Sequence, residues 1–424
     1  MFTGLLVTIY CLLFTYLANR KTDWAIYVIA ASLPSYLIRF QLLSIPLTLL
    51  EAMVIILFGV FLIKNKLSWL KNFYRQPFFG PTISLLFFAT LAMFLTPQLR
   101  AGAGIWKAYF IEPIMFFIVV TNTINSTAKI KKIIWALGLS LLYLSAVALA
   151  QKIGWLAETV PAAFLKPTGQ VDRVVSLFGY PNALGLYFGP LIILFSGFLF
   201  WGDKKTILQA AKLAIIVVGL IIIILAQSEA AIISIVAVWL LLLLINKKTR
   251  LPATMLLLLA VALFFLNPDI NQYLSAKLLL KDYSGFIRRL IWQESWQMLK
   301  DNWLFGAGLA GYQTKIANYH LPTFEIFLYP HNIFLNFWSE LGLIGLLAFG
   351  WLSLKFCWTN LRAIIKRNQN YIFNLFLLAI MVQFFIHGLV DAPYLKNDLS
   401  MLFWLILAFY VINDKIIHQP TEIA

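Results

Sequence analysis

Repeated apolar runs, each near twenty residues long, constrain the fold of this chain more than any other feature of its sequence. We count thirteen runs, or twelve if the short run at 24–39, which contains Pro34, is left out. A helix of about twenty residues crosses the hydrocarbon core of a bilayer, and a lone strand would leave its backbone unpaired in lipid. The sequence therefore predicts an all-α polytopic membrane protein with 12–13 transmembrane helices. The runs are 1–18, 24–39, 43–63, 80–97, 101–124, 133–151, 174–201, 207–227, 230–246, 251–266, 332–358, 370–390 and 398–413.

Composition agrees with this class and excludes others. The chain is 62% hydrophobic and 12% charged, whereas soluble domains are about half apolar and about a quarter charged. The net charge of +16 is spread over short loops, which is typical of topology signals and predicts no nucleic-acid partner. Neither a nucleotide-binding loop nor a metal-ligand spacing of the cysteines is present, so we expect no cofactor and no metal.

The basic loops predict the orientation in the membrane. Basic clusters such as Lys247/Lys248/Arg250 occupy every second loop, and the loops between them carry few basic residues. Short basic loops stay in the cytoplasm. We therefore expect one integral membrane domain, 1–424, with the longer loops 152–173 and 267–331 on the extracytoplasmic face.

The loop 267–331 contains a predicted amphipathic helix. Arg288, Trp292, Trp296, Leu299 and Trp303 follow one another at helical spacing and form one stripe. Three tryptophans on one face suit a membrane interface, where Arg288 could simply act as an anchor. The glycines of the next segment, FGAG, are expected to end this helix and to allow a tight turn.

Polar residues at the start of the next span allow two interpretations. His331 and Asn332 directly precede the run at 332–358, so His331 is either a helix cap or a general base that takes a proton from a hydroxyl. Glu340 lies inside the span, where a carboxylate needs a partner and is a functional candidate. A structural pairing with a Lys or Arg is the alternative.

The spaced pattern R-x-x-x-W, G-x-G and HN-x-x-L-x-x-x-x-E-x-G-x-x-G resembles the signature of the O-antigen ligase and O-antigen polymerase (Wzy-type) superfamily of bacterial membrane glycosyltransferases. The pattern residues here are Arg288 and Trp292; Gly306 and Gly308; and His331, Asn332, Leu335, Glu340, Gly342 and Gly345. The resemblance implies a type C glycosyltransferase-like fold. It also implies metal-independent transfer of a glycan from an undecaprenyl-pyrophosphate donor to a hydroxyl of a glycan or lipid acceptor.

Two other segments resemble the family, and one departs from it. The segment 173–190 contains Arg173, Gly179, Pro181 and Asn182, and the segment 387–404 contains His387 and Asp391, four residues apart. We weigh a structural His387–Asp391 pair equally with a site role. After the eighth span the family commonly has Ser-Arg, whereas this chain has Ser228 and Glu229.

By this resemblance, Arg173 and Arg288 would hold the pyrophosphate and His331 would act on the acceptor hydroxyl. A misalignment by one residue would exchange Arg288 with Arg289. The further substrate-binding candidates are Arg289, Asn332, Trp292, Glu340, Asn182, His387 and Asp391.

Several functions share such a scaffold. A ligase, a polymerase and a protein O-oligosaccharyltransferase differ in their acceptor, and the short outer loops favour the first two. A lipid-linked oligosaccharide flippase or polysaccharide transporter is the alternative from another class, since Lys107, Glu112 and Glu340 lie within apolar runs and could line a path. Sugar identity and oligomeric state stay open.

Overall fold

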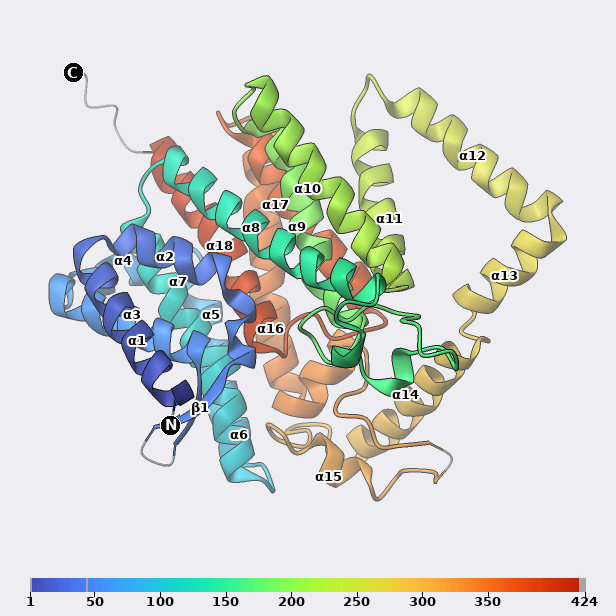
Figure 1. Ribbon diagram of the computed structural model, residues 1–424, viewed down its shortest axis with the longest axis horizontal. Helices are drawn as coiled ribbons and strands as arrows, with labels where there is room; N and C mark the ends of the chain where they lie inside the picture. Colours follow the sequence, from blue (N-terminus) through green and yellow to red (C-terminus); the bar gives the residue numbers. More distant parts are fainter. Residues whose placement is uncertain (1, 43–44, 323, 419–424) are drawn as a thin grey trace.

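The computed structural model describes residues 2–42, 45–322 and 324–418, and helices dominate it (Figure 1). The expected all-α architecture is confirmed. The first helices are α1 (Phe2–Arg20), α2 (Thr22–Ala31), α3 (Leu49–Asn65), α4 (Ser68–Tyr74), α5 (Phe79–Phe94), α6 (Leu99–Trp106), α7 (Glu112–Thr123) and α8 (Thr127–Lys152). The later helices are α9 (Asn182–Trp201), α10 (Thr206–Leu225), α11 (Glu229–Ile245), α12 (Arg250–Leu266), α13 (Pro268–Leu278), α14 (Tyr283–Asp301), α15 (Tyr312–Ile316), α16 (Ile333–Ile365), α17 (Tyr371–Gly388) and α18 (Asn397–His418).

Short helical turns connect some of these elements. A π-helical segment, η2 (Lys107–Ile111), joins α6 to α7 and makes one continuous helix of 25 residues, Leu99–Thr123. The 3-10 turns are η1 (Leu33–Leu37), η3 (Ala157–Thr159) and η4 (Ala162–Phe164). The last two lie in the predicted loop 152–173, which also contains an isolated bridge between Leu165 and Val171.

Fewer helices are long enough to span a membrane than the twelve or thirteen expected. Within the described ranges, 7 helices have the length and apolar composition of a span, or up to 9 if each of two bent pairs counts as one. The bent pairs are α4 with α5 (99°) and α12 with α13 (102°). The apolar run at 24–39 gives only the 10-residue α2 before η1 begins, and at about 1.5 Å per residue that helix covers half of a hydrocarbon core of about 30 Å.

One predicted helical region is a hairpin instead. The strands β1 (Arg39–Leu42) and β2 (Ile45–Thr48) pair antiparallel, with Arg39 opposite Thr48. The run at 43–63 was expected to be helical throughout; its residues 43–44 lie outside the described part, and α3 begins only at Leu49. The Thr48 hydroxyl accepts from the Glu51 backbone, and the Glu51 carboxylate accepts from the Thr48 backbone, so a capping box ends the strand and starts the helix.

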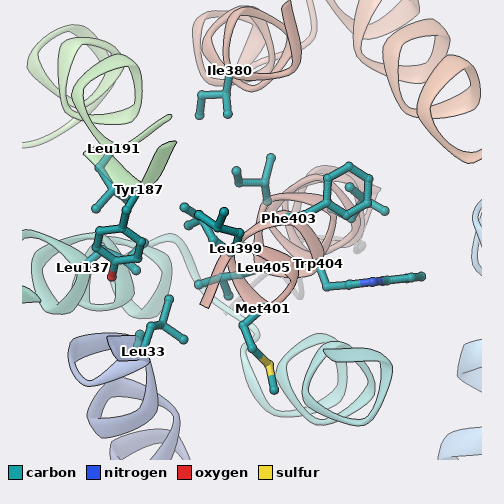
Figure 2. Packing of buried hydrophobic residues seen from close by; sticks show 14 of the residues in the cluster. Leu33, Leu137, Tyr187, Leu191, Ile380, Leu399, Met401, Phe403, Trp404 and Leu405 are labelled. Atoms are coloured by element: carbon teal, nitrogen blue, oxygen red, sulfur yellow. The ribbon is translucent and has the colours of Figure 1, made fainter. Parts of the chain in front are cut away.

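The core of the molecule surrounds α18 and α9. Figure 2 shows α18 in the centre, with side chains such as Leu399, Phe403 and Leu405 directed towards its neighbours. Leu137 and Tyr187 approach this centre from α8 and α9. Helix α9 and residues 401–412 of α18 are apolar on all sides, as expected for helices enclosed by other helices. The buried α18 fixes the position of the turn 389–396, which precedes it.

The connecting helices α14 and α15 lie together at one end of the molecule. In Figure 1 they occupy the lower end of the view with β1 and the start of α6, whereas the turn between α11 and α12 lies at the upper end. The expected helix in the loop 267–331 forms as α14, but it ends at Asp301, before Trp303 of the predicted stripe, and Leu299 is the only stripe residue on its buried face. Next to this end, α16 is interrupted at Gly342, whose backbone is non-helical (φ 75°, ψ 175°).

Candidate functional site

Three residues from the family pattern hold three successive residues of the turn after α17. The Asn332 side-chain amide donates to the Leu389 carbonyl (2.9 Å), and the Arg288 Nε donates to the Val390 carbonyl (3.0 Å). The Nδ1 atom of His331 lies 3.3 Å from Oδ1 of Asp391. The turn 389–391 is therefore the place where α14, the start of α16 and the end of α17 meet.

The backbone at His331 directs its imidazole towards Asp391. His331 has a φ of 49°, a left-handed conformation that is uncommon for residues other than glycine. Asp391 is 1% exposed. Burial alone would raise the pKa of the Asp391 carboxyl, but the hydrogen bond from His331, the charges of His331 and His387, and the Ala392 N–H lower the pKa to about 2. The ionised carboxylate favours the tautomer with the proton on Nδ1, which leaves Nε2 of His331 as the basic nitrogen.

Asn332 also starts helix α16. Its side-chain oxygen accepts from the backbone N–H groups of Phe334 (3.0 Å) and Leu335 (3.1 Å), so Asn332 is the N-cap. Because the amide nitrogen binds Leu389 at the same time, Asn332 fixes the helix start against the turn 389–391. This candidate substrate-binding residue thus has a positioning role in the structure.

Helix α14 presents Arg288 inwards and Arg289 outwards. Asp282 caps its N-terminus by accepting from the Gly285 N–H (3.3 Å). Arg288, one turn further on, is half-buried and also donates from a terminal nitrogen to Ser284 Oγ (2.9 Å). Arg289 is exposed, and its guanidinium lies 5.8 Å from the centre of the Phe286 ring. The geometry therefore favours Arg288 over its neighbour as the arginine of the site.

Trp292 connects α14 to the segment in front of His331. Its indole N–H donates to the Pro330 carbonyl (2.9 Å). Tyr329 precedes this proline and His331 follows it, and the centres of their two rings lie 4.7 Å apart. Trp292 was expected to belong to an interfacial stripe. Its hydrogen bond instead fixes residues 329–331, while Trp296 and Trp303 of the same stripe stay largely exposed.

His387 and Asp391 do not form the pair that their spacing suggested. Helix α17 ends at Gly388, so Asp391 lies beyond the helix and turns to His331 instead. The ring nitrogens of His387 are buried, and neither has a hydrogen-bond partner in the part of the chain that the structure describes. His387 still interacts electrostatically with Asp391 and with Arg288.

Arg173 and Asn182 form a second cluster. The Arg173 guanidinium donates to Asn182 Oδ1 (3.1 Å) and to the carbonyls of Ala226 (3.0 Å) and Gln227 (3.3 Å). Burial lowers the pKa of Arg173, against the opposing charges of Asp172 and Glu229. Arg173 thus ties the start of α9 to the junction of α10 and α11. No direct contact joins it to Arg288 or His331 among the described residues.

Two tyrosines connect the clusters. Tyr180, in the loop that follows Arg173, forms a side-chain hydrogen bond with Tyr329, next to His331. The Lys396 ammonium lies 5.6 Å from the centre of the Tyr180 ring, 4.0 Å from that of Phe178 and 3.5 Å from the Asp398 carboxylate. The sequence analysis did not select Tyr180, Tyr329 or Lys396. Lys396 could have been found as a cation in the segment 387–404, directly after the site turn.

Glu340, Gly306 and Gly342 join the segment 304–310 to helix α16, and these contacts are called the Gly306–Glu340 brace. The Glu340 carboxylate accepts from the Ala310 N–H (2.7 Å), so its partner is a backbone group and not the Lys or Arg considered as the structural alternative. Gly306 and Gly342 have φ values of 63° and 75°. A Cβ at Gly306 would collide with the carbonyl oxygen of Ser339, and one at Gly342 with that of Leu304. Only glycine allows these two backbones to approach so closely.

Glu229, the departure from the family pattern, binds helix α13. Its carboxylate lies 2.8 Å from the Lys277 ammonium and accepts from the Tyr273 hydroxyl (3.3 Å). Lys277 also pairs with Asp282, the cap of α14 (3.0 Å). The acidic residue therefore links the start of α11 to the helix that carries Arg288.

Comparison with known proteins agrees with the resemblance found in the sequence. Residues 214–350 match the family model described as O-Antigen ligase. The matched region contains Arg288, His331, Asn332 and the Gly306–Glu340 brace, and it stops before Asp391. A search of curated proteins finds no match to the chain. With its apolar helices, the chain is a multi-pass membrane protein, and its segment 214–350 is similar to the O-antigen ligase family.

Proposed function

We propose that the protein is a glycosyltransferase that moves a glycan from an undecaprenyl-pyrophosphate carrier to an acceptor hydroxyl at the extracytoplasmic face of the bacterial inner membrane. The observation that carries the proposal is the meeting of Arg288 and His331 at the turn 389–391, where Asp391 orients the imidazole. A fixed guanidinium beside a histidine–carboxylate pair suits the departure of a phosphate and the activation of a hydroxyl.

In the proposed reaction the acceptor oxygen attacks the anomeric carbon and forms the new glycosidic bond. The bond between this carbon and the pyrophosphate oxygen breaks, and the leaving group keeps the electron pair. The hydroxyl proton passes to Nε2 of His331, while Asp391 stabilises the imidazolium that forms. A single displacement of this kind inverts the anomeric configuration.

Arg288 would neutralise the charge that develops on the leaving pyrophosphate. Two of its guanidinium nitrogens bind Val390 and Ser284, so one terminal nitrogen stays available for a phosphate oxygen. Arg173 would contribute from the second cluster, in front of the loop whose Tyr180 forms a hydrogen bond with Tyr329. Because the Arg173 guanidinium binds Asn182 and the α10–α11 junction, its main proposed role is to position that loop.

The geometry favours this function over a flippase. A flippase needs charged groups along a path between the two faces of the membrane. Lys107 instead pairs with Glu51 on α3 (3.4 Å), and Glu340 holds a backbone group. Of the three charges considered, Glu112 alone has carboxylate oxygens without a hydrogen-bond partner among the described residues. The match to the O-antigen ligase family model supports ligase or polymerase action, and a glycan or lipid acceptor is part of the proposal.

Transfer by the purified protein in proteoliposomes tests the proposal. With undecaprenyl-pyrophosphate-linked glycan as donor, the wild-type protein should form the transferred product. His331→Ala should bind the donor normally and lose about a hundred- to ten-thousand-fold in turnover, the usual range for a general base. His418→Ala, which changes an exposed histidine near the end of α18, is the matched control. Near-normal turnover of His331→Ala would contradict the mechanism.

A further inference from the structure

A cavity of about 280 Å³ opens at the far end of α14 from Arg288. The side chains that surround it include Leu95, Asp301, Asn302, Trp303, Phe305 and Lys315. None of them belongs to the transfer site described above. The volume is close to the lower limit of about 300 Å³ for small-molecule sites, so the cavity suits a single compact ring.

The polar groups of this cavity are fixed by the protein. The Lys315 ammonium donates to Asn302 Oδ1 (3.0 Å) and to the Gly306 carbonyl (2.9 Å). The Asp301 carboxylate accepts from the Tyr319 hydroxyl through one oxygen (2.6 Å). Each group thus keeps hydrogen-bonding capacity for a further partner, since an ammonium has three protons and a carboxylate has two oxygens.

The charge of the cavity distinguishes it from the site around Arg288. One carboxylate, Asp301, and one ammonium, Lys315, compensate each other, so a phosphate gains little here. The aromatic side chains Trp303 and Phe305 are 55% and 47% exposed. A ligand that matches this surface is uncharged, with an apolar face for an aromatic ring and hydroxyl groups at its edge. A sugar ring has this chemistry.

We propose that this cavity binds a sugar residue of the glycan, with Trp303 against the ring and Asp301, Asn302 and Lys315 at its hydroxyl groups. The inference rests on the proposed function and adds a subsite to it. Arg288 and Asp301 lie on the same helix, α14, and at about 1.5 Å per residue they are about 20 Å apart along its axis. The bound sugar is therefore remote from the bond that is made and broken.

Replacing the Trp303 side chain does not remove the hydrogen bonds that residue 303 makes within the fold. Its backbone carbonyl, and not its side chain, accepts from the Trp338 indole (2.7 Å) and from the Leu343 N–H (3.3 Å). Asp301→Asn removes the charge but keeps an oxygen for Tyr319, and Tyr319→Phe removes the Tyr319 bond but keeps the carboxylate. The matched aromatic control is Trp155→Ala, at a side chain that is 78% exposed in the loop 152–173.

The test measures binding of the free glycan, released from its lipid carrier by mild acid, to the full-length protein in nanodiscs by titration calorimetry. Trp303→Ala and Asp301→Asn should each weaken binding by about tenfold or more. Trp303→Phe should keep most of it, and Trp155→Ala, Tyr319→Phe and His331→Ala should bind like the wild type. Undiminished binding by Trp303→Ala and Asp301→Asn, or an equal loss in Trp155→Ala, would overturn the proposal.

Transfer assays on the same proteins separate this proposal from the proposed function. Trp303→Ala should raise KM for the glycan substrate and leave kcat nearly unchanged, because the subsite contacts substrate and transition state alike. Normal transfer by His331→Ala, with glycan binding still dependent on Trp303, would overturn the mechanism and keep the subsite. Loss of transfer in His331→Ala, with glycan binding independent of Trp303, would support the mechanism and overturn the subsite.

Discussion

The imidazole of His331 and the carboxylate of Asp391 lie 3.3 Å apart although 60 positions separate them in the chain. The pair joins the start of α16 to the turn between α17 and α18. It also determines which imidazole nitrogen is free, because the carboxylate accepts a hydrogen bond from the Nδ1–H group. The role proposed for Asp391 is therefore orientation of the base, with no contact to the reacting atoms.

Asp391→Asn should reduce turnover about a hundredfold or more while donor binding persists. The substitution keeps the side-chain shape but offers an N–H to His331, which favours the tautomer with the proton on Nε2. This imidazole cannot accept the hydroxyl proton. Steady-state kinetics with purified donor measure the effect, and Glu325→Gln, at an exposed carboxylate before His331, is the control. A fall in donor affinity with unchanged kcat would contradict an orienting role.

Arg288→Ala should weaken donor binding and turnover together, because a guanidinium contacts the pyrophosphate before and during its departure. Arg288→Lys should restore only part of either, since an ammonium cannot reproduce the planar fork that binds Val390 and Ser284 and reaches a phosphate. Arg289→Ala is the matched control on the adjacent, exposed position. A larger loss in Arg289→Ala than in Arg288→Ala would exchange the roles of the two residues.

Gly306→Ala should destabilise the protein by about 1–3 kcal/mol, because a left-handed backbone and a collision with the Trp338 and Ser339 carbonyls would have to be relieved. The melting temperature in detergent should fall accordingly. Gly350→Ala, in helix α16, is the matched control, since a Cβ there meets no neighbouring atom within 4 Å. A helix-interior alanine should leave stability unchanged or raise it. Equal melting temperatures for both variants would remove the packing role assigned to Gly306.

The local parts of this structure follow from the sequence, and the contacts between distant segments do not. The stripe from Arg288 to Leu299 predicts α14 because helical periodicity is a property of neighbouring residues. The bond from Arg288 to Val390 spans 102 positions, and no spacing rule gives such a pairing. A Lys or Arg was the alternative partner considered for Glu340, yet its carboxylate binds the Ala310 N–H, and the sequence does not show which backbone N–H a turn will present.

Hydropathy also predicted the secondary structure of some segments wrongly. Residues 43–48 were expected to belong to a span, but Ile45–Thr48 pairs with Arg39–Leu42, so the two short segments satisfy each other's backbone as β2 and β1. Hydropathy reports transfer to an apolar environment and not which hydrogen bonds the backbone makes. His387 and Asp391 illustrate the same limit, because a helix end between them, at Gly388, cancels the i, i+4 relationship.

The orientation predicted from the basic loops can be tested directly. In a background without Cys11 and Cys357, a cysteine at position 300 should react with an impermeant maleimide in intact cells, whereas a cysteine at position 362 should not. Lys300 is exposed near the end of α14, and Arg362 lies in the last turn of α16. Labelling of position 362 with protection of position 300 would invert the topology and place the site in the cytoplasm.

His320 makes the segment before the site sensitive to pH. Its Nδ1 lies 3.1 Å from the Glu294 carboxylate on α14, and its Nε2 lies 2.7 Å from the Phe324 carbonyl. Only the doubly protonated imidazolium can donate to both acceptors. The hydrogen bond with Glu294 raises the pKa of His320, burial opposes the shift, and the Phe324 carbonyl and the Glu294 charge support it.

A group whose pKa is raised by folding stabilises the fold fully below its ordinary pKa, about 6.5 for histidine. That stabilisation is lost as the pH rises through the raised value. A spin label at position 325, in the background without native cysteines, should therefore become more mobile as the pH rises from about 6 to about 9. His320→Gln should abolish this pH dependence, because it removes the titrating group that joins Glu294 to Phe324, and His418→Gln should leave it unchanged. If the mobility of the wild-type label did not change with pH, the imidazolium would not be the link between α14 and this segment.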